Sequence, residues 1–264
     1  MDLGLKNKVI IVSGSSQGLG FASALSFARE GAKVAICSRK KNSIETAADK
    51  ILSKVPSADI LAFTVDMTNA LSIQQFVNQV IKKWETVHVC VTNTGGPPSM
   101  QFMEAGDDIW QQAFNLTLMS AVRLSRAVIP IMQKQRWGRI IHICSASVKN
   151  PIPNLLMSNS LRSAVVAMSK TQSNELAAEN ILVNCLLPGW TDTERVGEIM
   201  TAKAKYQQIS LDEAYMQRKN MIPLKRMGTP EEIADSIVFL ASERASFITG
   251  TNLTVDGGET RIPF

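Results

Sequence analysis

Short runs of β-branched and other apolar residues recur along the chain, and longer segments with helical spacing separate them. The runs cover residues 8–13, 33–38, 60–65, 87–92, 139–144, 181–187 and 252–255. Parallel strands have such continuous apolar sequences when both faces of their sheet are covered, because neither face meets solvent. The alternation predicts an α/β fold: a Rossmann-type, doubly wound parallel sheet of about seven strands with helices on both faces.

Two of the intervening segments carry clear helix-end signals. Residues 19–31 have apolar residues at helical spacing and end at Gly31, a residue that favours the left-handed cap of a helix C-terminus. Residues 229–242 begin with Thr229 as a candidate N-cap and Pro230 in the first turn, followed by two glutamates at the positive end of the helix dipole. Both segments are predicted to be helices.

A helix-like, methionine-containing insert, roughly residues 194–226, interrupts the alternation after the sixth strand. Ligands of such sheets bind at the carboxyl ends of the strands, so we expect the insert to form a small helical lid over a substrate pocket. No composition shift, internal repeat or Pro/Ser-rich hinge divides the chain. We interpret residues 1–264 as one dinucleotide-binding domain that contains this lid.

The bulk composition, with 45% hydrophobic and 19% charged residues, is that of a globular protein. The N-terminus lacks the apolar stretch of a signal peptide, and no apolar run reaches the length of about 18 residues that a membrane span needs. We therefore expect a cytoplasmic protein without membrane contact. The net charge of +5 comes from dispersed Lys and Arg residues apart from a cluster at 39–41, which gives little support for nucleic acid as a partner.

Residues for metal or disulfide chemistry are few. The only histidines are His88 and His142, so we expect no metal site. The cysteines are widely spaced, form no C-x-x-C pair and lie in or beside apolar runs, which predicts buried reduced thiols: Cys37, Cys90, Cys144 and Cys185.

The first strand leads into the glycine-rich sequence SGSSQGLG. Glycines at this spacing allow a tight turn, let backbone N–H groups approach a pyrophosphate, and direct the next helix N-terminus at its charge. The sequence therefore predicts a dinucleotide-binding loop. Its candidate cofactor-binding residues are Gly14, Ser16, Gly18, Leu19 and Gly20.

The end of the second strand indicates which dinucleotide binds. Sites for NAD usually carry Asp or Glu there, where the carboxylate binds the ribose hydroxyls and repels a 2′-phosphate. This chain has Ser38, Arg39 and Lys40 instead. A hydroxyl and two cations favour the phosphorylated ribose, so we predict NADPH/NADP⁺ as the cofactor. The basic cluster at 39–41 is then explained without nucleic acid.

At this point several stretches in the expected order resemble the short-chain dehydrogenase/reductase family in its classical single-domain form. SGSSQGLG is similar to the family's T-G-x-x-x-G-x-G loop, VDMT (65–68) to its adenine-contacting stretch, and NTGG (93–96) to its N-N-A-G motif. The family's helix asparagine lies in a segment that FNLTLMS resembles, and its strand-five serine in one that GRIIHICSAS resembles. Its P-G loop over the nicotinamide is similar to LPGWTDT. The resemblance covers essentially the whole chain. Within the family, the chain resembles the 3-oxoacyl-[acyl-carrier-protein] reductases.

The resemblance implies further contacts with the cofactor, beginning with Asp66 and Met67 at the adenine. The others lie after the later strands: Asn93, Gly95, Arg162, Pro188, Gly189, Thr191 and Thr193. It also implies a homo-oligomer, a dimer or tetramer, because residues 228–258 are similar to the ending with which family subunits pack together.

In that family a Tyr, a Lys four residues later, a Ser and an Asn form the catalytic set. The resemblance assigns the Ser to Ser145 and the Asn to Asn115. Counting forward from Ser145, and back from the Ser-Lys pair at 169–170, places Ser158 at the tyrosine position and Arg162 at the lysine position. S-x-x-x-R therefore replaces Y-x-x-x-K. The sequence YMQRK at 215–219 lies in the insert and is not this motif.

The two replacements change the proton chemistry of the predicted site. A phenol can be tuned toward neutrality, whereas the Ser158 hydroxyl does not ionise usefully near pH 7 without a base beside it. Arg162 stays charged and cannot pass a proton, but it can hydrogen-bond a ribose and stabilise a developing alkoxide. Ser158 could hold a water in the space that a phenol leaves, and this water could protonate the product.

Three functions remain open at the level of sequence. The first is an NADPH-dependent reductase of a small-molecule activated ketone, such as a β-ketoacyl thioester or a 1,3-dicarbonyl, with an unconventional proton route. In it Ser145 and Arg162 stabilise the carbonyl and the alkoxide, and a water acts through Ser158. The second is a non-catalytic NADPH-binding subunit or sensor. The third is a redox-neutral reaction, or one whose acid comes from Tyr206 or Tyr215 of the insert.

Overall fold

The computed structural model describes residues 1–262 of the chain. Seven strands form one parallel sheet in the order β3-β2-β1-β4-β5-β6-β7. Their bounds are β1 Val9–Val12, β2 Lys33–Ser38, β3 Asp59–Thr64, β4 Val89–Thr92, β5 Gly138–Ile143, β6 Ile181–Pro188 and β7 Asn252–Val255. The predicted sheet is confirmed, because each of the seven apolar runs forms a strand whose ends lie within two residues of the predicted ends.

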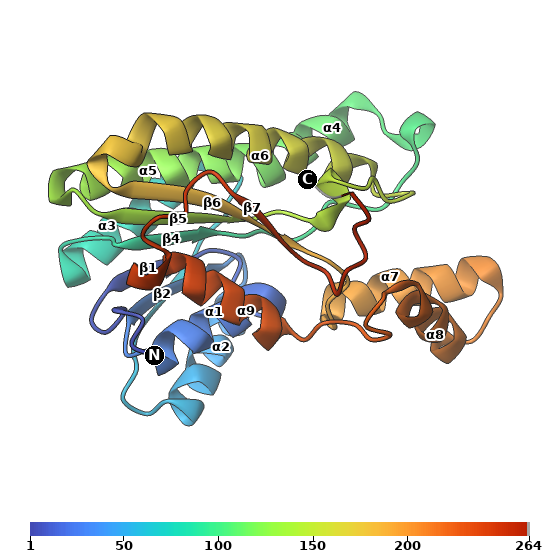
Figure 1. The fold of residues 1–264 in the computed structure, drawn as a ribbon, viewed down its shortest axis with the longest axis horizontal. Helices are drawn as coiled ribbons and strands as arrows, with labels where there is room; N and C mark the ends of the chain where they lie inside the picture. Colours follow the sequence, from blue (N-terminus) through green and yellow to red (C-terminus); the bar gives the residue numbers. More distant parts are fainter. Residues whose placement is uncertain (263–264) are drawn as a thin grey trace.

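Helices cover both faces of the sheet, as Figure 1 shows. One face carries α1 (Gly18–Arg29), α2 (Lys41–Lys54) and α9 (Pro230–Ala241). The other carries α3 (Ala70–Trp84), α5 (Ser120–Gln135) and α6 (Leu156–Leu176). Helix α4 (Asp107–Phe114) continues into α5 through a π-helical turn, Asn115–Met119, and short 3₁₀ turns span Phe102–Glu104, Ala146–Val148, Ala177–Glu179 and Glu243–Ala245.

The side chains of β1 explain why its sequence is apolar throughout. Ile10 and Val12 pack into the core beneath α1, α2 and α9, whereas Val9 and Ile11 pack into the core beneath α3 and α5. All four side chains are at most 2% exposed. Successive residues of a strand point to opposite faces, so a strand between two helical layers must be apolar at every position.

The end signals of the two predicted helices act as expected. Helix α1 ends at Arg29, and Gly31 follows with φ +74°, in the left-handed region. At the start of α9, the Thr229 hydroxyl accepts a hydrogen bond from the backbone N–H of Glu232, whose carboxylate accepts one from the N–H of Thr229. This reciprocal capping box satisfies N–H groups that the helix itself cannot pair.

The insert forms two helices, α7 (Glu194–Gln207) and α8 (Leu211–Met221), which project from the body of the protein in Figure 1. The Thr193 side chain caps α7 by accepting a hydrogen bond from the backbone N–H of Val196. A small apolar cluster holds the two helices to the segment before α9; its buried members are Val196, Met200, Ile222 and Met227.

The predicted buried thiols are confirmed, since Cys37, Cys90, Cys144 and Cys185 are all buried and unpaired. Burial raises the pKa of the Cys37 thiol to about 12. Within residues 1–262, no group of three or more His, Cys, Asp and Glu residues could hold a metal ion. None of the helices in this range is both long and apolar enough to span a membrane.

The strand order places a binding crevice at one end of the sheet. The chain builds β1, β2 and β3 toward one edge and then returns to add β4 on the other side of β1. Such a reversal separates the loops after the two central strands and opens a crevice at their carboxyl ends. The glycine-rich loop after β1 and the NTGG segment after β4 therefore both lie at this crevice.

Candidate active site

A cavity of about 260 Å³ lies at the carboxyl ends of β1, β4, β5 and β6. Its walls come from the glycine-rich loop, residues 93–97, the end of β5, the first turns of α6, the P-G loop and the start of α7. It brings together most of the predicted site residues: Gly14, Gly18, Leu19, Asn93, Gly95, Ser145, Ser158, Arg162, Pro188, Gly189, Thr191 and Thr193.

The glycine-rich loop is built for close backbone approach. Gly14 has φ +58°, and a Cβ atom there would lie 2.8 Å from the carbonyl oxygen of Asn93. A Cβ atom on Gly20 would lie only 2.4 Å from the carbonyl oxygen of Gly14. The Asn93 amide donates to that same Gly14 carbonyl at 2.9 Å, which holds the loops after β1 and β4 together. Side chains at these glycines would therefore push the two loops apart.

The N-terminus of α1 offers free donors to an anion. Its N-cap residue, Gln17, makes no side-chain capping bond, and the first turn contains no acidic residue. The leading N–H groups of a helix have no partner inside it, and they carry the positive end of its dipole. Together with the glycine-rich loop, this helix end fits the pyrophosphate of a dinucleotide.

The ends of β2 and β3 lie side by side, because Ser38 pairs with Thr64 in the sheet register. Arg39 and Lys40 are exposed there, and the Ser38 hydroxyl donates to the Lys40 carbonyl at 3.1 Å. Hydrogen bonds from the backbone and hydroxyl of Thr68 lower the pKa of Asp66, and the charge of Arg39 lowers it further. Two cations next to one ionised carboxylate leave net positive charge where the adenosine end of the cofactor is predicted.

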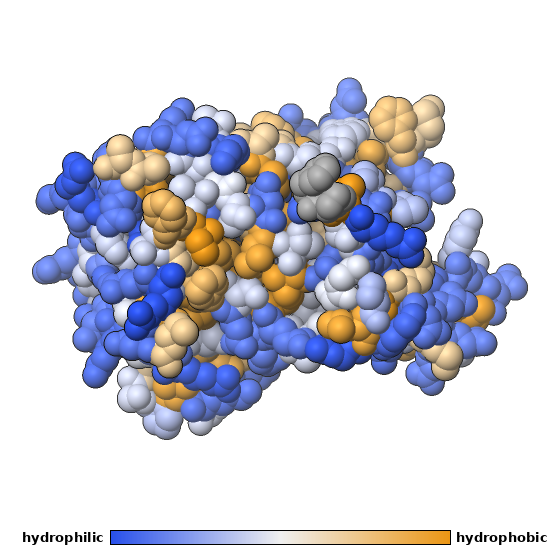
Figure 2. Space-filling model, in the orientation of Figure 1, coloured by the Kyte–Doolittle hydropathy of each residue, from blue (hydrophilic) through white to orange (hydrophobic). Residues whose placement is uncertain are grey.

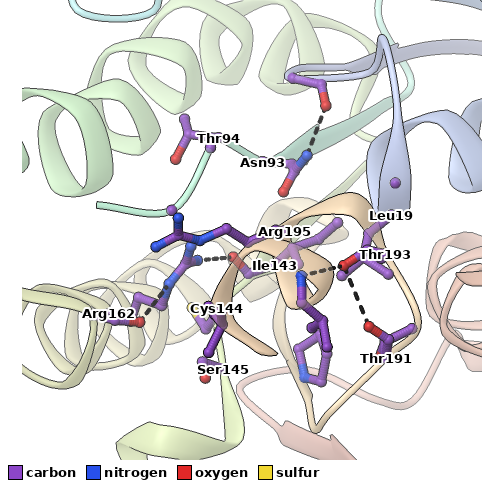
Figure 3. Close-up of a pocket in the computed structure, with 18 of the residues that line it drawn as sticks. Leu19, Asn93, Thr94, Ile143, Cys144, Ser145, Arg162, Thr191, Thr193 and Arg195 are labelled. Carbon is purple, nitrogen blue, oxygen red and sulfur yellow. Dashed lines mark hydrogen bonds between the residues drawn. The ribbon is translucent and has the colours of Figure 1, made fainter. Parts of the chain in front are cut away.

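Arg162 is fixed at the floor of the cavity. Its Nη1 donates to the carbonyl oxygen of Ile143 at 2.9 Å, and its Nε donates to the Ser158 hydroxyl oxygen at 3.2 Å (Figure 3). Ser158 and Arg162 are four residues apart, so they lie on the same face of α6. Burial lowers the pKa of the Arg162 guanidinium, the neighbouring Cys144 raises it and the charge of Arg195 lowers it.

The two candidate serines keep their hydroxyl protons available. Ser145 follows β5, and its oxygen accepts a hydrogen bond from the backbone N–H of Ser147 at 3.1 Å. The oxygen of Ser158 accepts from Arg162. A hydroxyl can donate one hydrogen bond and accept two, so each serine can still donate its proton to a ligand in the cavity.

Other predicted residues lie outside this cavity. Asn115 opens the π-helical turn, where its amide donates to the Gln111 carbonyl and its oxygen accepts from Arg123. Its side chain therefore points into its own helix. Ser16 and Gly20 belong to the loop and helix behind the lining, and the predicted adenosine contacts sit further along the sheet edge; these are Ser38, Arg39, Lys40, Asp66 and Met67.

The tyrosines of the insert do not line the cavity. Tyr206 is 87% exposed near the end of α7. Tyr215 packs on the apolar cluster of the insert, with its hydroxyl beside Gly197. The geometry gives neither phenol a place at the cavity, so it offers no support for an acid donated by the insert.

Several residues that line the cavity were not among the predicted sites, and Arg195 is the charged one with the most defined contacts. Arg195, on the first turn of α7, donates from Nη2 to the carbonyl oxygen of Pro97 at 2.8 Å, across the mouth of the cavity. The sequence signal was its place two residues after Thr193, directly behind the P-G loop. A second arginine of the insert, Arg218, has a side chain that is only 10% exposed; it forms an ion pair with Glu259 and lies above the ring of Trp190.

A second, smaller cavity of about 120 Å³ adjoins the first at Ser145. Most of its lining is apolar, from Ile152, Leu155, Trp190, Val196 and Ile199. Glu259 lies at its edge, held there by Arg218. The arrangement suits a small molecule with a polar reacting end near Ser145 and an apolar part beyond it.

Comparison with known proteins places this geometry among oxidoreductases. A family model described as enoyl-(acyl carrier protein) reductase matches residues 14–260. The NADPH-dependent reductase BacG of Bacillus subtilis is 30% identical over 257 residues, which cover 97% of this chain and 99% of BacG. The 3-oxoacyl-[acyl-carrier-protein] reductase FabG of Thermotoga maritima is 30% identical over 254 residues, 96% of this chain and 98% of that protein.

Among solved structures, L-sorbose reductase from Gluconobacter frateurii, in complex with NADPH and L-sorbose, superposes with a TM-score of 0.94. It is 32% identical, and the match covers 99% of this chain and all of that one. The agreement in sequence and in fold extends over nearly the full length of both proteins. The chain thus belongs to the short-chain dehydrogenase/reductase family.

Proposed function

We propose that this protein is an NADPH-dependent reductase of a small-molecule ketone. The observation that carries the proposal is the meeting of three hydrogen-bond donors, the hydroxyls of Ser145 and Ser158 and the guanidinium of Arg162, in one cavity beside the glycine-rich loop. A ketone oxygen placed among them would be polarised, and it would be stabilised as it gains negative charge.

The cofactor is NADPH. The free N-terminus of α1 and the close-packed glycines fit its pyrophosphate, and Arg39 and Lys40 supply positive charge for its 2′-phosphate. BacG and the sorbose reductase, both NADPH-linked by name, support the same choice. When bound, NADPH supplies the hydride that a ketone reduction needs.

The protein's own groups would position the ketone and manage its charge. The Ser145 hydroxyl would donate a hydrogen bond to the ketone oxygen, because its oxygen already accepts one from the backbone N–H of Ser147 while its own proton is free. Arg162 cannot swing away, since the Ile143 carbonyl and the Ser158 hydroxyl hold it, so its charge stays beside the forming alkoxide. Ser158 donates to a water, which delivers the proton to the alkoxide and draws it from solvent.

The sizes of the two rate contributions, from a general acid and from positioning of the substrate, favour an enzyme that is slowed but still active. A positioned general acid contributes roughly 10²- to 10⁴-fold to a rate. Placing the hydride donor against the carbonyl contributes up to about 7–11 kcal/mol of the barrier. Loss of the family phenol therefore slows the reaction without removing its largest source of acceleration. Activated ketones, such as β-ketoacyl thioesters and 1,3-dicarbonyls, depend least on the acid and are the proposed substrates.

A panel of ketones tests the proposal. Stopped-flow absorbance would follow oxidation of enzyme-bound NADPH with activated ketones and with a simple cyclic ketone. We expect turnover of the activated ketones, about a 10²- to 10³-fold loss in Arg162→Met and a smaller loss in Ser158→Ala. Ser160→Ala, an exposed serine on the same helix, is the matched control and should not change the rate.

The same experiment separates the main alternative, a non-catalytic NADPH-binding subunit or sensor. The replaced tyrosine and lysine are the observation that favours that alternative. Tight NADPH binding with no turnover of any ketone, and no gain in the double variant Ser158→Tyr with Arg162→Lys, would establish it and end the reductase proposal. Tyr215→Phe should leave the rate unchanged, because its phenol lies outside the cavity.

We also propose that residues 194–226 act as a lid and that the chain is one domain. Four residues from the start of α7, Glu194, Arg195, Val196 and Ile199, already line the active-site cavity, whereas α8 supplies none of the lining. Movement of α7 would therefore open or close the cavity directly. Limited proteolysis tests this, because NADPH and substrate together should slow cleavage within residues 194–226.

A homo-oligomer, a dimer or tetramer, is a further proposal. Figure 2 shows apolar side chains gathered on the face where β7 forms the free edge of the sheet, between α6 and α9. Phe247 is fully exposed, Phe239 is 38% exposed, and Leu253 and Val255 of β7 are only partly buried. Apolar surface of this kind often marks an interface. Light scattering during size-exclusion chromatography would give the mass in solution, and a monomer would contradict the proposal.

A further inference from the structure

The active-site cavity contains two arginines from different elements. Arg162 comes from α6 and Arg195 from the first turn of α7, and both line the same cavity. Figure 3 shows their guanidinium groups approaching each other between Thr94 and Ile143. The charge of Arg195 is also close enough to lower the pKa of Arg162. Two like charges in one cavity repel each other, so the arrangement favours an anion between them.

Among the residues that the structure describes, the only ion pair made by either arginine is a surface one, between Arg195 and Glu198. Within residues 1–262, no carboxylate forms an ion pair with Arg162, whose partners are a neutral hydroxyl and a neutral carbonyl. Arg195 pairs with Glu198 at 3.1 Å, but the Glu198 side chain is 67% exposed. Water and salt weaken such a surface pair, so a bound anion can replace it.

The cofactor phosphates are not the natural anion for Arg195. The side chains nearest Gly18 of the phosphate loop are those of Thr193 and Glu194, and Arg195 is not among them. Arg195 turns the other way, toward Gly96 and Pro97 on the opposite wall. Its guanidinium lies close to that of Arg162 in the same cavity (Figure 3).

We propose that the substrate of this reductase is a keto acid, whose carboxylate is held between Arg195 and Arg162 while its ketone oxygen meets Ser145. The planar guanidinium fork matches a carboxylate in two parallel hydrogen bonds. The adjoining 120 Å³ cavity, lined by Ile152, Leu155, Trp190 and Ile199, takes a short apolar chain beyond the ketone. This inference rests on the proposed function, because it names the substrate class for the same site.

The reduction balances with NADPH and one proton from solvent. A C–H bond of the reduced nicotinamide would break as its hydride forms a new C–H bond at the ketone carbon, the C=O π pair would move onto oxygen, and that oxygen would take the solvent proton through the bound water. The products are a hydroxy acid and NADP⁺, and the carboxylate leaves unchanged. In a 2-oxo acid, the carboxylate next to the ketone also activates that ketone by electron withdrawal, which suits a site that lacks the phenol acid.

Binding of a non-reducible analogue tests the inference without turnover. Calorimetry would titrate oxamate, which carries a carboxylate next to an amide carbonyl, into the enzyme–NADP⁺ complex. Oxamide, nearly the same shape but neutral, is the matched ligand. We expect oxamate to bind at least ten-fold more tightly than oxamide, and Arg195→Gln to lower oxamate affinity about ten-fold or more. Lys205→Gln, an exposed cation on the same helix, should change it less than two-fold.

Each contrary outcome has a definite meaning. Equal binding of oxamate and oxamide, or failure of both to bind, would overturn the keto-acid inference. If Arg195→Gln weakens NADP⁺ as much as oxamate, Arg195 serves the cofactor and the inference is also wrong. A kinetic arm compares 2-oxobutanoate with its methyl ester, and we expect the free acid to have the lower KM. If oxamate binds through Arg195 but no ketone oxidises NADPH, the anion site stands and the reductase proposal fails.

Discussion

The choice between NADPH and NADH depends on Arg39, and its replacement by alanine gives a quantitative test. Arg39 is exposed at the end of β2, where it can hold the 2′-phosphate of NADPH in two hydrogen bonds. Hydrogen bonds to charged groups contribute about 1.5–3 kcal/mol, and exposure puts this one at the lower end of the range. Each 1.4 kcal/mol is a factor of ten in affinity. Arg39→Ala should therefore weaken NADPH about 10- to 30-fold.

The same change should leave NADH almost unaffected, because NADH has no phosphate at that position. Asp66 sharpens the contrast. Hydrogen bonds from Thr68 lower the pKa of its carboxyl group, and Arg39 is close enough for its charge to lower that pKa further. Without Arg39, the negative charge of Asp66 would repel a phosphate bound nearby. Adding Asp66→Asn to Arg39→Ala should therefore recover part of the lost NADPH affinity. Fluorescence titration of each nucleotide at two salt concentrations measures all of these constants.

Lys41→Ala provides the control for charge alone. Lys41 starts α2 two residues away, and its only ion-pair partner in the part of the chain that the structure describes is Glu45, at 3.8 Å on the surface. Its removal should change NADPH affinity less than about three-fold, and less still at high salt. Equal losses for NADPH and NADH in Arg39→Ala, or an equal loss in Lys41→Ala, would refute the 2′-phosphate assignment.

Three further outcomes test the structure. Gly20→Ala should abolish nucleotide binding and lower stability, because its Cβ would lie 2.4 Å from the Gly14 carbonyl oxygen; titration and thermal melting would check both effects. Arg218→Met should lower the free energy of unfolding in urea by about 2–3 kcal/mol, because it leaves Glu259 without its ion-pair partner. Adding Glu259→Gln should recover part of this loss, whereas additive losses in the double variant would argue against the ion pair. Burial lowers the pKa of His88 to about 4, below its value of 6.5 in the unfolded chain, so the unfolded state takes up more protons and stability falls as the pH drops from 6.5 toward 4. In urea unfolding at pH 4.5, His88→Gln should reduce this loss of stability by about 1–2 kcal/mol. An unchanged pH dependence would exclude this histidine as the source of the loss.

The sheet was predictable because burial on both faces leaves a direct mark on each strand. In β1 that mark is four consecutive apolar residues, Val9–Val12, divided between the two cores. The start of α9 was equally predictable, because the hydrogen bonds of a capping box are local and Thr229 and Glu232 are three residues apart. Signals of this kind need no knowledge of the rest of the fold.

The site was predictable from the strand pattern where its residues follow strands, whereas Ser158 and Arg162 on α6 were placed only through the family resemblance. Ser145 and the glycine loop could be placed because the carboxyl ends of parallel strands share one edge. Arg195 was missed because its role depends on where α7 turns after the P-G loop, and no local pattern records that it reaches the Pro97 carbonyl. Likewise, nothing in the sequence around Arg218 indicates that it pairs with Glu259, 41 residues away.

The first turn of α7 has a consequence for the order in which ligands come and go. Thr193 and Glu194 stand against Gly18 on one wall of the cavity, and Arg195 bonds to Pro97 on the other. The turn thus spans the cavity between the glycine-rich loop and residues 96–97. If residues 194–226 act as the proposed lid, this turn has to lift for the dinucleotide to enter or leave. Kinetics should accordingly be ordered, with the nucleotide first in and last out, and the lifting of a single helical turn should set the ceiling on turnover.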